Sequence, residues 1–321
     1  MKYILIDCDP GHDDALAILT AVAQKSAITI LGVTTIGGNQ TLEKVTKNAK
    51  NVLSFIQSDI PLAMGQEGPL VKTLEPSDEA HGDSGMDGPL FDGLDYPVVS
   101  YNAVDFMYEK IKSSPHKVTI VGLGPLTNIA LLLKVYPEIH SKIDCISLMG
   151  GGISHGNTTS LAEFNIYVDP EAAHIVFNSG IEIIMSGLDV TEKAEILVSE
   201  IDTLKNKGRV SHLAYELLHF YNESGKQFGF INSPIHDLCA IAYLVNANMF
   251  NGTKYYVNVD TSDGISRGLT FADKRRKSEG LANTLVLEDV NREIFTQLLI
   301  ESLEILDKKI KIGRASCRER V

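Results

Sequence analysis

Hydrophobic runs alternate with amphipathic stretches along most of this chain. Five of the runs are continuous and rich in β-branched residues, which is typical of strands that are covered on both faces of a parallel sheet. They are YILI, TILGVTTI, KVTIVGL, DCISLMG and IEIIMSG, which begin at residues 3, 29, 117, 144 and 181. The pattern therefore predicts the central strands of a mainly parallel sheet.

Helical patterns lie between and after these runs. The clearest are ALAILTAVAQ, TLEKVTKNAKNVLSFI, NAVDFMYEKI and PEAAHIVFNS. Asp169 precedes the last of them and, with Pro170, has the order of a helix N-terminus. This alternation predicts an α/β fold, a single domain with a Rossmann-like open sheet flanked by helices. No Gly/Ser-rich linker or internal repeat divides residues 1–311, so we expect one domain there.

The last ten residues, IGRASCRERV at 312–321, have no apolar periodicity. We expect them to follow the end of the final helix. They resemble the translation of a sequencing-adapter read, which predicts a non-native cloning or assembly scar. The alternative is a genuine basic tail.

Polar segments follow the predicted strands, and parallel strands deliver such segments to one edge of a sheet. DCDPGHDDA at 7–15 follows the first strand, and Asn39 in GGNQT follows the second. GPLTN at 124–128 and GGISHGNTTSLAEFN at 151–165 follow the next two. These strand ends are therefore expected to converge on one pocket. The loop at 65–97 is long and rich in Gly, Asp and Pro, as functional loops often are.

Four carboxylates lie within eight residues of the first segment: Asp7, Asp9, Asp13 and Asp14. Strand-end polarity and helix capping would account for one or two of them. Packed together without positive charge, the others would take up protons. A hard cation bound by oxygens is the simpler explanation, and both calcium and magnesium fit. Zinc is disfavoured because no His/Cys cluster accompanies the acids.

Composition limits the partners. The chain has a formal net charge of −12 and no basic run before its last residues, which argues against a nucleic acid or an anionic membrane. No stretch reaches the roughly 18 apolar residues of a membrane-spanning helix, and the start has no signal-peptide pattern. The four cysteines have no metal-binding spacing and indicate a reducing compartment. We therefore expect a cytoplasmic protein.

DCDPGHDDA resembles the N-terminal motif of the inosine-uridine-preferring nucleoside hydrolases. Four further segments follow in the order of that family: GGNQT, GLGPLTNIA, LMGGG through AEFNIYVDPEAAHIV, and HDLCA. The resemblance extends to about residue 311. It implies calcium-dependent hydrolysis of the N-glycosidic bond of ribonucleosides, by a homodimer or homotetramer.

The resemblance also implies roles for individual residues. Calcium would be bound by the side chains of Asp9, Asp14 and Asp237 and by the backbone carbonyl of Leu123. Asp13 would be the base that activates a metal-bound water. Ribose hydroxyls would be bound by Asn39, Asn157, Glu163 and Asn165, with Met149 and Phe164 lining the sugar. His81 and His236 would face the nucleobase, and His236 is the better candidate for donating a proton to it.

Several of these residues have simpler interpretations. Asn39 could be a turn residue, Glu163 part of an ordinary loop, and His81 a solvated histidine. His236 and Asp237 could cap the helix that follows them. The helical stripe of Tyr215, Phe220 and Tyr221 is more typical of a core than of a pocket, and Cys8 is expected to be a packed thiol.

Two other classes of protein remain possible from the residues alone. A calcium-dependent nucleoside- or sugar-binding protein without turnover would keep the acids and the ribose contacts, whereas Asp13 and His236 favour an enzyme. A metal-dependent phosphohydrolase would require Lys or Arg in the site segments, which contain none. Purine or pyrimidine preference stays open, because it depends on residues 222–237, where Gln227, Phe228 and Phe230 are candidates.

Overall fold

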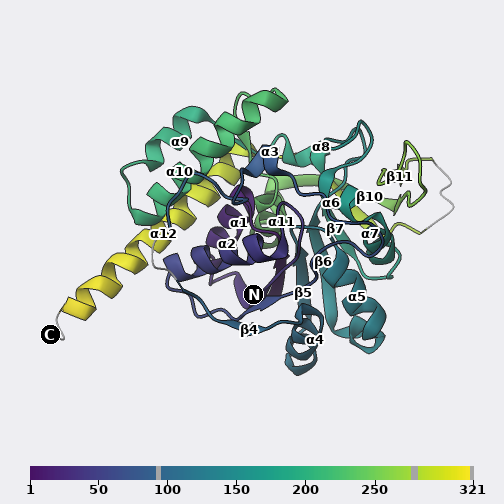
Figure 1. Ribbon diagram of the computed structural model, residues 1–321, viewed down its shortest axis with the longest axis horizontal. Coiled ribbons are helices and arrows are strands. Elements are labelled where there is room, and N and C mark those ends of the chain that lie inside the picture. The colour runs from purple at the N-terminus through teal and green to yellow at the C-terminus, as the bar shows by residue number, and fades with distance from the viewer. Residues whose placement is uncertain (92–94, 276–280, 319–321) are drawn as a thin grey trace.

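A twisted ten-stranded sheet forms the centre of the protein (Figure 1). The computed structural model describes residues 1–91, 95–275 and 281–318. The strands of the sheet are β1 (Lys2–Cys8), β2 (Ile28–Thr35), β3 (Leu62–Met64), β4 (Val98–Ser100), β5 (Val118–Gly122), β6 (Ile143–Met149), β7 (Ile183–Ser186), β10 (Phe250–Val259), β11 (Thr270–Asp273) and β12 (Thr284–Val290). A separate antiparallel pair is formed by β8 (Glu195–Ile196) and β9 (Ser233–Pro234).

The strand order is β11-β10-β12-β7-β6-β5-β1-β2-β3-β4. Every pairing from β4 across to β12 is parallel, and β10 is antiparallel to both of its neighbours. The chain leaves β1 toward β2 and later returns to its other side at β5. This reversal creates a crevice at the carboxyl ends of β1 and β5, where open α/β sheets bind ligands.

Helices cover both faces of the sheet. They are α1 (His12–Ala23), α2 (Leu42–Phe55), α3 (Asp78–His81), α4 (Ala103–Ser113), α5 (Thr127–Val135), α6 (Phe164–Val168), α7 (Pro170–Phe177), α8 (Leu188–Thr191), α9 (Val198–Leu204), α10 (Arg209–Gly225), α11 (Leu238–Val245) and α12 (Arg292–Arg318). Short 3₁₀ turns lie at Pro137–Lys142, Lys226–Phe228 and Ala247–Met249. The predicted α/β fold is confirmed.

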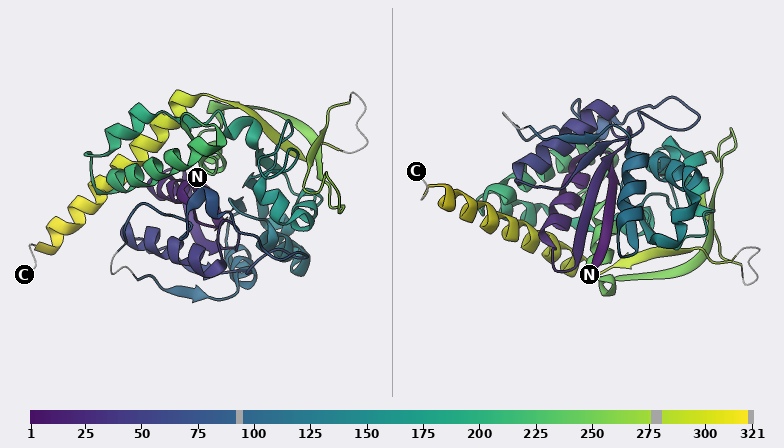
Figure 2. Two further views of the ribbon diagram at one scale, coloured as in Figure 1. Left: turned by 45° about the horizontal axis from the view of Figure 1, so that its top comes forward. Right: turned by 90° about the horizontal axis from the view of Figure 1, so that it is seen from below.

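The hydrophobic core has two parts, one on each face of the sheet. Ile4 and Ile6 of β1 pack with α1, α2 and α10 to α12, whereas Leu5 points to the other face and packs with α4, α5 and α7. Figures 1 and 2 show the two groups of helices on opposite sides of the strands. Because both faces are covered, the central strands are hydrophobic at nearly every position, as the sequence pattern indicated.

The helix α7 begins at the local signal that predicted it. The Asp169 side chain accepts a hydrogen bond from the Ala172 amide at 3.0 Å, and Pro170 begins α7. Its other carboxylate oxygen accepts from the Leu70 amide and the Thr127 hydroxyl, at 2.8 and 2.6 Å. This one buried side chain therefore joins the loop after β3 to α5 and α7, close to the carboxyl edge of the sheet.

The last helix was expected to end before residue 312. It does not, because α12 continues to Arg318. Its final turns extend away from the body of the protein (Figures 1 and 2). The segment contains no proline and only one glycine, and arginine and alanine favour the helix, so its composition does not stop α12.

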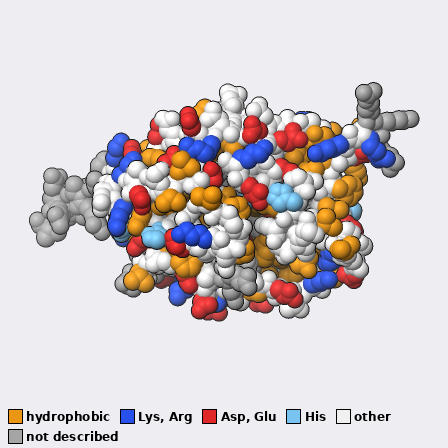
Figure 3. All heavy atoms as spheres, turned by 90° about the horizontal axis from the view of Figure 1, so that it is seen from above, with side chains coloured by type: hydrophobic (Ala, Val, Ile, Leu, Met, Phe, Trp, Pro, Cys, Tyr) orange, Lys and Arg blue, Asp and Glu red, His pale blue; other side chains and the backbone are white. Residues whose placement is uncertain are grey.

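Surface charge is mixed on the face drawn in Figure 3, where basic and acidic side chains are interspersed outside the grey atoms. Among the described residues, no helix has both the length and the apolar character needed to cross a membrane.

Candidate active site

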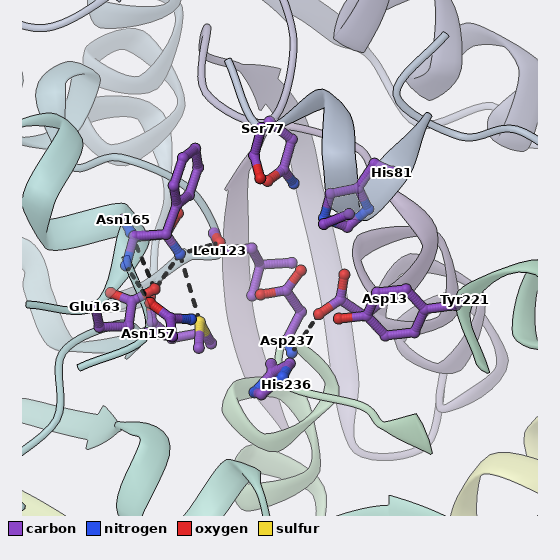
Figure 4. Close-up of a pocket in the computed structure, with 14 residues that line it drawn as sticks. Asp13, Ser77, His81, Leu123, Asn157, Glu163, Asn165, Tyr221, His236 and Asp237 are labelled. Carbon is purple, nitrogen blue, oxygen red and sulfur yellow. Dashed lines mark hydrogen bonds between the residues drawn. The ribbon is translucent and has the colours of Figure 1, made fainter. Parts of the chain in front are cut away.

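A polar cavity of about 110 Å³ lies at the carboxyl ends of β1, β2, β5 and β6 (Figure 4). It is lined by Asp13, Asn39, Ser77, Ala80, His81, Leu123, Met149, Asn157, Glu163, Phe164, Asn165, Tyr221, His236 and Asp237. Eleven of these residues were assigned to the site from the sequence, so the expected convergence of strand ends is confirmed. Two more, Asp9 and Asp14, are fully buried next to them.

Three carboxylates meet at this cavity. Asp13, Asp14 and Asp237 each place one oxygen within 4.8 Å of the others, although Asp237 comes from the far end of the chain. The backbone amide of Asp237 donates to Oδ2 of Asp13 at 3.4 Å, and the Gly11 amide donates to Oδ2 of Asp14 at 2.9 Å. Asp237 has the position of a helix N-cap, but its side chain makes no capping hydrogen bond. Its carboxylate is therefore available to the cluster.

Asp9 lies beside this group. Its Oδ2 accepts a hydrogen bond from the Asn39 amide at 2.7 Å. Its Oδ1, and Oδ1 of Asp14, are buried and have no hydrogen-bond partner in the described structure. A buried carboxylate oxygen is costly without a partner. These two oxygens therefore require either protons or a cation.

Burial gives the four acids unusual proton affinities. Desolvation, with repulsion from Asp14, raises the pKa of Asp13 to about 7, and desolvation raises the pKa of Asp14 to about 6. Desolvation and neighbouring charge also raise the pKa of Asp9 and of Asp237 well above the usual range. Without positive charge, the cluster would hold protons near neutral pH.

The residues fit a hard cation. The donors are carboxylate oxygens, two of them orphaned, and the carbonyl of Leu123 lies at the same cavity. Oxygen donors of this kind suit calcium or magnesium. No Lys or Arg is among the residues that line the cavity, so a cation is the available source of positive charge.

Asp7 belongs to a different environment from the other acids of its segment. Its Oδ1 accepts hydrogen bonds from Thr34 Oγ1 at 2.5 Å and from Asn128 Nδ2 at 2.8 Å. Burial raises the pKa of Asp7 to about 7 despite these bonds. Asp7 is therefore one of the acids that strand-end polarity accounts for, because it hydrogen-bonds to side chains of β2 and α5.

The opposite wall of the cavity is formed by the loop after β6. Glu163 is buried and accepts hydrogen bonds from three backbone amides, those of Gly151, Asn165 and Ile166, at 2.7, 2.9 and 3.2 Å. It thus caps α6 and orders the loop, which an ordinary loop residue would not do. Desolvation raises the pKa of Glu163 above its usual value.

Asparagines orient the polar groups of this wall. The side-chain Nδ2 of Asn165 donates to the backbone carbonyls of Leu123 and Met149 at 2.9 and 3.2 Å. Oδ1 of Asn157 accepts from the Phe164 amide at 3.0 Å. On the other side, Asn39 Nδ2 donates to the Asp9 carbonyl at 3.2 Å. Asn39 is therefore more than a turn residue, because it fixes the acidic loop.

His81 is buried rather than solvated, and a second histidine, His12, holds it. The two Nδ1 atoms lie 3.2 Å apart, and Nε2 of His12 lies 2.8 Å from the carbonyl oxygen of Asp87. A Cβ placed on Gly11 would lie 2.5 Å from Nδ1 of His81, so only glycine leaves room for this ring. Burial lowers the pKa of His12 to about 4 and that of His81 well below its usual value.

His236 stands directly before Asp237 at the start of α11. Its Nδ1 lies 2.8 Å from the hydroxyl oxygen of Thr191, the last residue of α8. Burial lowers the pKa of His236 to about 4. A neutral imidazole is thus favoured at this position in the protein.

Tyr221 corrects an expectation, because it lines the cavity instead of the core. Its ring stacks on His12 and His81 with centroid distances of 5.6 Å in both cases. Figure 4 shows Tyr221 and His81 at the same side of the cavity. Burial and the acids nearby raise the pKa of Tyr221 well above its usual range. The helical pattern indicates that this face of α10 is buried, but it cannot show whether the face is buried by the core or lines a binding site.

Ser77 and Ala80, from the long loop and α3, carry no signal in the sequence that would have identified them individually.

A second cavity of about 340 Å³ adjoins the first, and the residues shared by the two are Ser77, Ala80, Asn157, Phe164, Tyr221 and His236. Phe228 and Phe230 line it, as candidates for contact with a nucleobase, and Gln227 does not appear among the lining residues. An apolar compartment therefore continues from the polar one.

Comparison with known proteins identifies the family. Residues 4–297 match the family described as inosine-uridine preferring nucleoside hydrolase. The chain belongs to this family, as the sequence motifs predicted. Members of this family act on the N-glycosyl bond of ribonucleosides, so the prediction of an enzyme is also confirmed. The rival assignments, a binding protein without turnover and a phosphohydrolase, are set aside.

Proteins similar to this chain in sequence include ribonucleoside hydrolases. The pyrimidine-specific ribonucleoside hydrolase RihA of Shewanella sp. (strain ANA-3) is 44% identical over 308 residues, which cover 95% of this chain and 96% of the relative. The protein of that name from Escherichia coli O7:K1 (strain IAI39 / ExPEC) is 43% identical over 305 residues, covering 94% and 98%.

Solved structures share the fold. The plant nucleoside hydrolase PpNRh1 has a TM-score of 0.87 at 30% identity, over 94% of this chain and 99% of its own. The purine-preferring ribonucleoside hydrolase from Gardnerella vaginalis has a TM-score of 0.89 at 28% identity, over 96% and 99%.

Proposed function

We propose that this protein is a calcium-dependent, pyrimidine-preferring ribonucleoside hydrolase. The observation that carries the proposal is the meeting of an acidic cluster with a wall of asparagine and glutamate side chains in one cavity. Such a cavity offers oxygens for a cation on one side and hydrogen-bonding groups for a sugar on the other.

Asp9, Asp14, Asp237 and the Leu123 carbonyl would hold the calcium ion. When bound, the ion would supply the positive charge that keeps these carboxylates ionised and polarises the oxygens it contacts. The pair of orphaned oxygens on Asp9 and Asp14 supports this assignment. The choice of calcium over magnesium rests on the family resemblance and on a set of donors that can satisfy a larger, flexible coordination shell.

The remaining groups would bind substrate and transfer protons. Asn39, Asn157, Glu163 and Asn165 would hold the ribose hydroxyls, with Met149 and Phe164 against the sugar. Asp13 would take a proton from the attacking water, a role that suits a carboxylate whose pKa burial brings toward neutrality. A carboxylate-rich pocket also stabilises the positive charge that develops on the sugar as the bond breaks. His236 would donate a hydrogen bond to the departing nucleobase, with His81 also facing the base.

Pyrimidine preference is supported by the relatives that are 43–44% identical, because both are named pyrimidine-specific. The purine-preferring structure is 28% identical, a more distant relationship. Phe228 and Phe230 of the adjoining cavity could stack on a base of either kind.

Ribose release from a panel of nucleosides tests the proposal. Uridine and cytidine should be hydrolysed faster than inosine and adenosine, and a chelator should abolish the activity until calcium is restored. Restoration by magnesium but not calcium would overturn the choice of metal. Turnover of inosine above that of both pyrimidine nucleosides would overturn the preference.

We further propose, from the family resemblance, that the protein acts in nucleoside salvage or catabolism as a homodimer or homotetramer in the cytoplasm. Light scattering coupled to gel filtration measures the assembly directly. A monomer at micromolar concentration would contradict the proposed oligomer.

A further inference from the structure

The hydroxyl of Thr191 has one hydrogen-bond partner in the part of the chain that the structure describes. That partner is Nδ1 of His236, at 2.8 Å, and the Thr191 side chain is fully buried. A hydroxyl can donate or accept here. If it accepted, its own hydrogen would be left without a partner in a buried site, which is unfavourable. The hydroxyl therefore donates, and Nδ1 of His236 accepts.

This assignment fixes the proton of His236. A neutral imidazole carries one hydrogen, and with Nδ1 as acceptor that hydrogen is on Nε2. No described residue hydrogen-bonds to Nε2, and the ring lines both the polar cavity and the adjoining apolar one. His236 therefore presents an N–H donor to the space where a nucleobase would lie.

His81, the other histidine that lines the cavity, is held by His12 in the opposite tautomer. Nε2 of His12 lies 2.8 Å from the carbonyl oxygen of Asp87, and a carbonyl can only accept. One hydrogen of His12 is thus on Nε2. No carboxylate among the described residues is hydrogen-bonded to this ring to stabilise a second proton, so Nδ1 of His12 accepts from Nδ1 of His81 at 3.2 Å. His81 then carries its hydrogen on Nδ1 and turns the lone pair of Nε2 away from His12.

A change of tautomer at His12 or His236 would break the hydrogen bond to Asp87 or to Thr191. The ring of His12 also packs against the rings of His81 and Phe220, with centroid distances of 5.4 and 5.0 Å. No carboxylate oxygen is hydrogen-bonded to His12, His81 or His236 among the described residues, so none of these rings has the partner that would stabilise a second proton.

We propose that Thr191 and His12 are positioning residues that lock the two pocket histidines in opposite tautomers, His236 as a hydrogen-bond donor and His81 as an acceptor. The proposal rests on the proposed function for its catalytic consequence. It gives a structural reason for the expectation that His236, and not His81, is the donor to the base.

The consequence concerns how the nucleobase leaves. The water oxygen bonds to C1′ and its proton goes to Asp13, while the C1′–N bond breaks and its electron pair leaves with the base. His236 keeps its proton and stabilises the departing base by a hydrogen bond from Nε2. The base afterwards takes a proton from solvent. A neutral histidine acting as an electrophile in this way has precedent in other enzymes.

The test uses the full chain labelled with ¹⁵N-histidine, together with Thr191→Val and Thr191→Ser. In the wild type at neutral pH, ring-nitrogen NMR should show a protonated Nε2 for His236 and a protonated Nδ1 for His81. His236→Gln and His81→Gln assign the signals. In Thr191→Val, His236 should show a mixture of tautomers, and Thr191→Ser should restore the wild-type pattern. His12→Phe should change the tautomer of His81 alone.

Kinetics provide the second readout. Thr191→Val should lower kcat on uridine by at least about 10-fold, since a wrong tautomer can cost as much as about 10⁴ in another enzyme. The same variant should keep near-normal rates on p-nitrophenyl riboside, whose leaving group is already a stable anion. Thr191→Ser should resemble the wild type on both substrates.

Three results would overturn the proposal. They are a protonated Nδ1 on His236 in the wild type, an equal loss of rate on both substrates in Thr191→Val, and a loss in Thr191→Ser as large as in Thr191→Val. If Thr191→Val does not fold, the wild-type spectrum and the Ser variant still decide. If the wild type gives the expected spectrum but does not hydrolyse ribonucleosides, the proposed function is wrong and the assignment of the tautomers is unaffected.

Discussion

The backbone amide of Asp237 donates a hydrogen bond to the side chain of Asp13 across 3.4 Å, although 224 residues separate them in the sequence. The first turn of α1, which contains Asp13, thereby contacts Asp237, the N-cap of α11. Both helix N-termini carry partial positive charge toward the acidic cluster, which favours the ionised carboxylates there. The N-termini of two helices that are distant in sequence therefore lie at the same acidic cluster.

Asp9→Asn should remove calcium binding and activity while the sheet stays folded. A change next to a metal ligand typically costs about 10–100-fold in affinity or activity, and loss of a ligand should cost at least that. Asp7→Asn is the matched control, because it makes the same change two residues away, in a carboxylate that already accepts hydrogen bonds from Thr34 and Asn128. Calorimetric titration of chelator-treated protein with calcium compares the two. Equal binding by Asp9→Asn and Asp7→Asn would remove Asp9 from the metal site.

The metal-free protein should lose stability as the pH rises from about 4 to about 7. Folding raises the pKa of Asp14 to about 6 and that of Asp13 to about 7 from 3.8, and it also raises the pKa of Asp7, Asp9 and Asp237. These five carboxyl groups outnumber the three buried histidines whose pKa folding lowers, so the folded state binds more protons than the unfolded state in this window. Stability then falls with rising pH, by about 1.4 kcal/mol for each unit of pKa difference. Calcium should reverse the loss at pH 7 and have little effect at pH 4.5. Thermal melting with and without calcium measures this, and equal gains at both pH values would contradict it.

The substrate should need both the 2′ and the 3′ hydroxyl of ribose. A site built to bond hydroxyls leaves its own buried polar groups unpaired when one is missing, which can lower the rate by about 10⁴. Deoxyuridine should therefore be a poor substrate. Uridine 5′-monophosphate should be poorer still, because its phosphate would meet carboxylates with no Lys or Arg among the lining residues. Comparable kcat/KM for uridine and its monophosphate would contradict the assignment of the sugar wall.

Asp13 and His236 should respond differently to the leaving group. Asp13→Ala removes the base that the attacking water needs, so rates should fall by about 10²–10⁴ on uridine and on p-nitrophenyl riboside alike. His236→Ala should impair uridine hydrolysis and largely spare the activated riboside. Steady-state kinetics on both substrates distinguish the roles. Near-normal rates for Asp13→Ala on either substrate would exclude it as the base.

The sequence predicts the centre of this fold better than its edges. Strands β1, β2, β5, β6 and β7 are covered on both faces, so nearly every position in them is apolar and the signal is strong. The strands β3, β4 and β11 have three or four residues each, too few for a period to be recognised. Their positions depend on pairing with neighbours that are distant in sequence.

The site shows the same limit. Asp13, Asn39 and Leu123 belong to segments that follow a strand, and they line one cavity because the topology brings strand ends together. Asp7 and Asp9 are two residues apart and look alike in the sequence, yet only Asp7 has Thr34 and Asn128 as partners. Tyr221 lies on an amphipathic helix, whose pattern indicates coverage and not what covers it. Long-range contacts decide both cases.

The close approach of His81 to Gly11 has a consequence for reading homologous chains. The backbone at Gly11 has φ −103°, which any residue can adopt, so glycine is required here by the neighbouring ring and not by the turn. A chain that replaced His81 with a small residue would free position 11 to carry a side chain. Positions 11 and 81 should therefore vary together across an alignment, and a homologue with alanine at the first should lack histidine at the second.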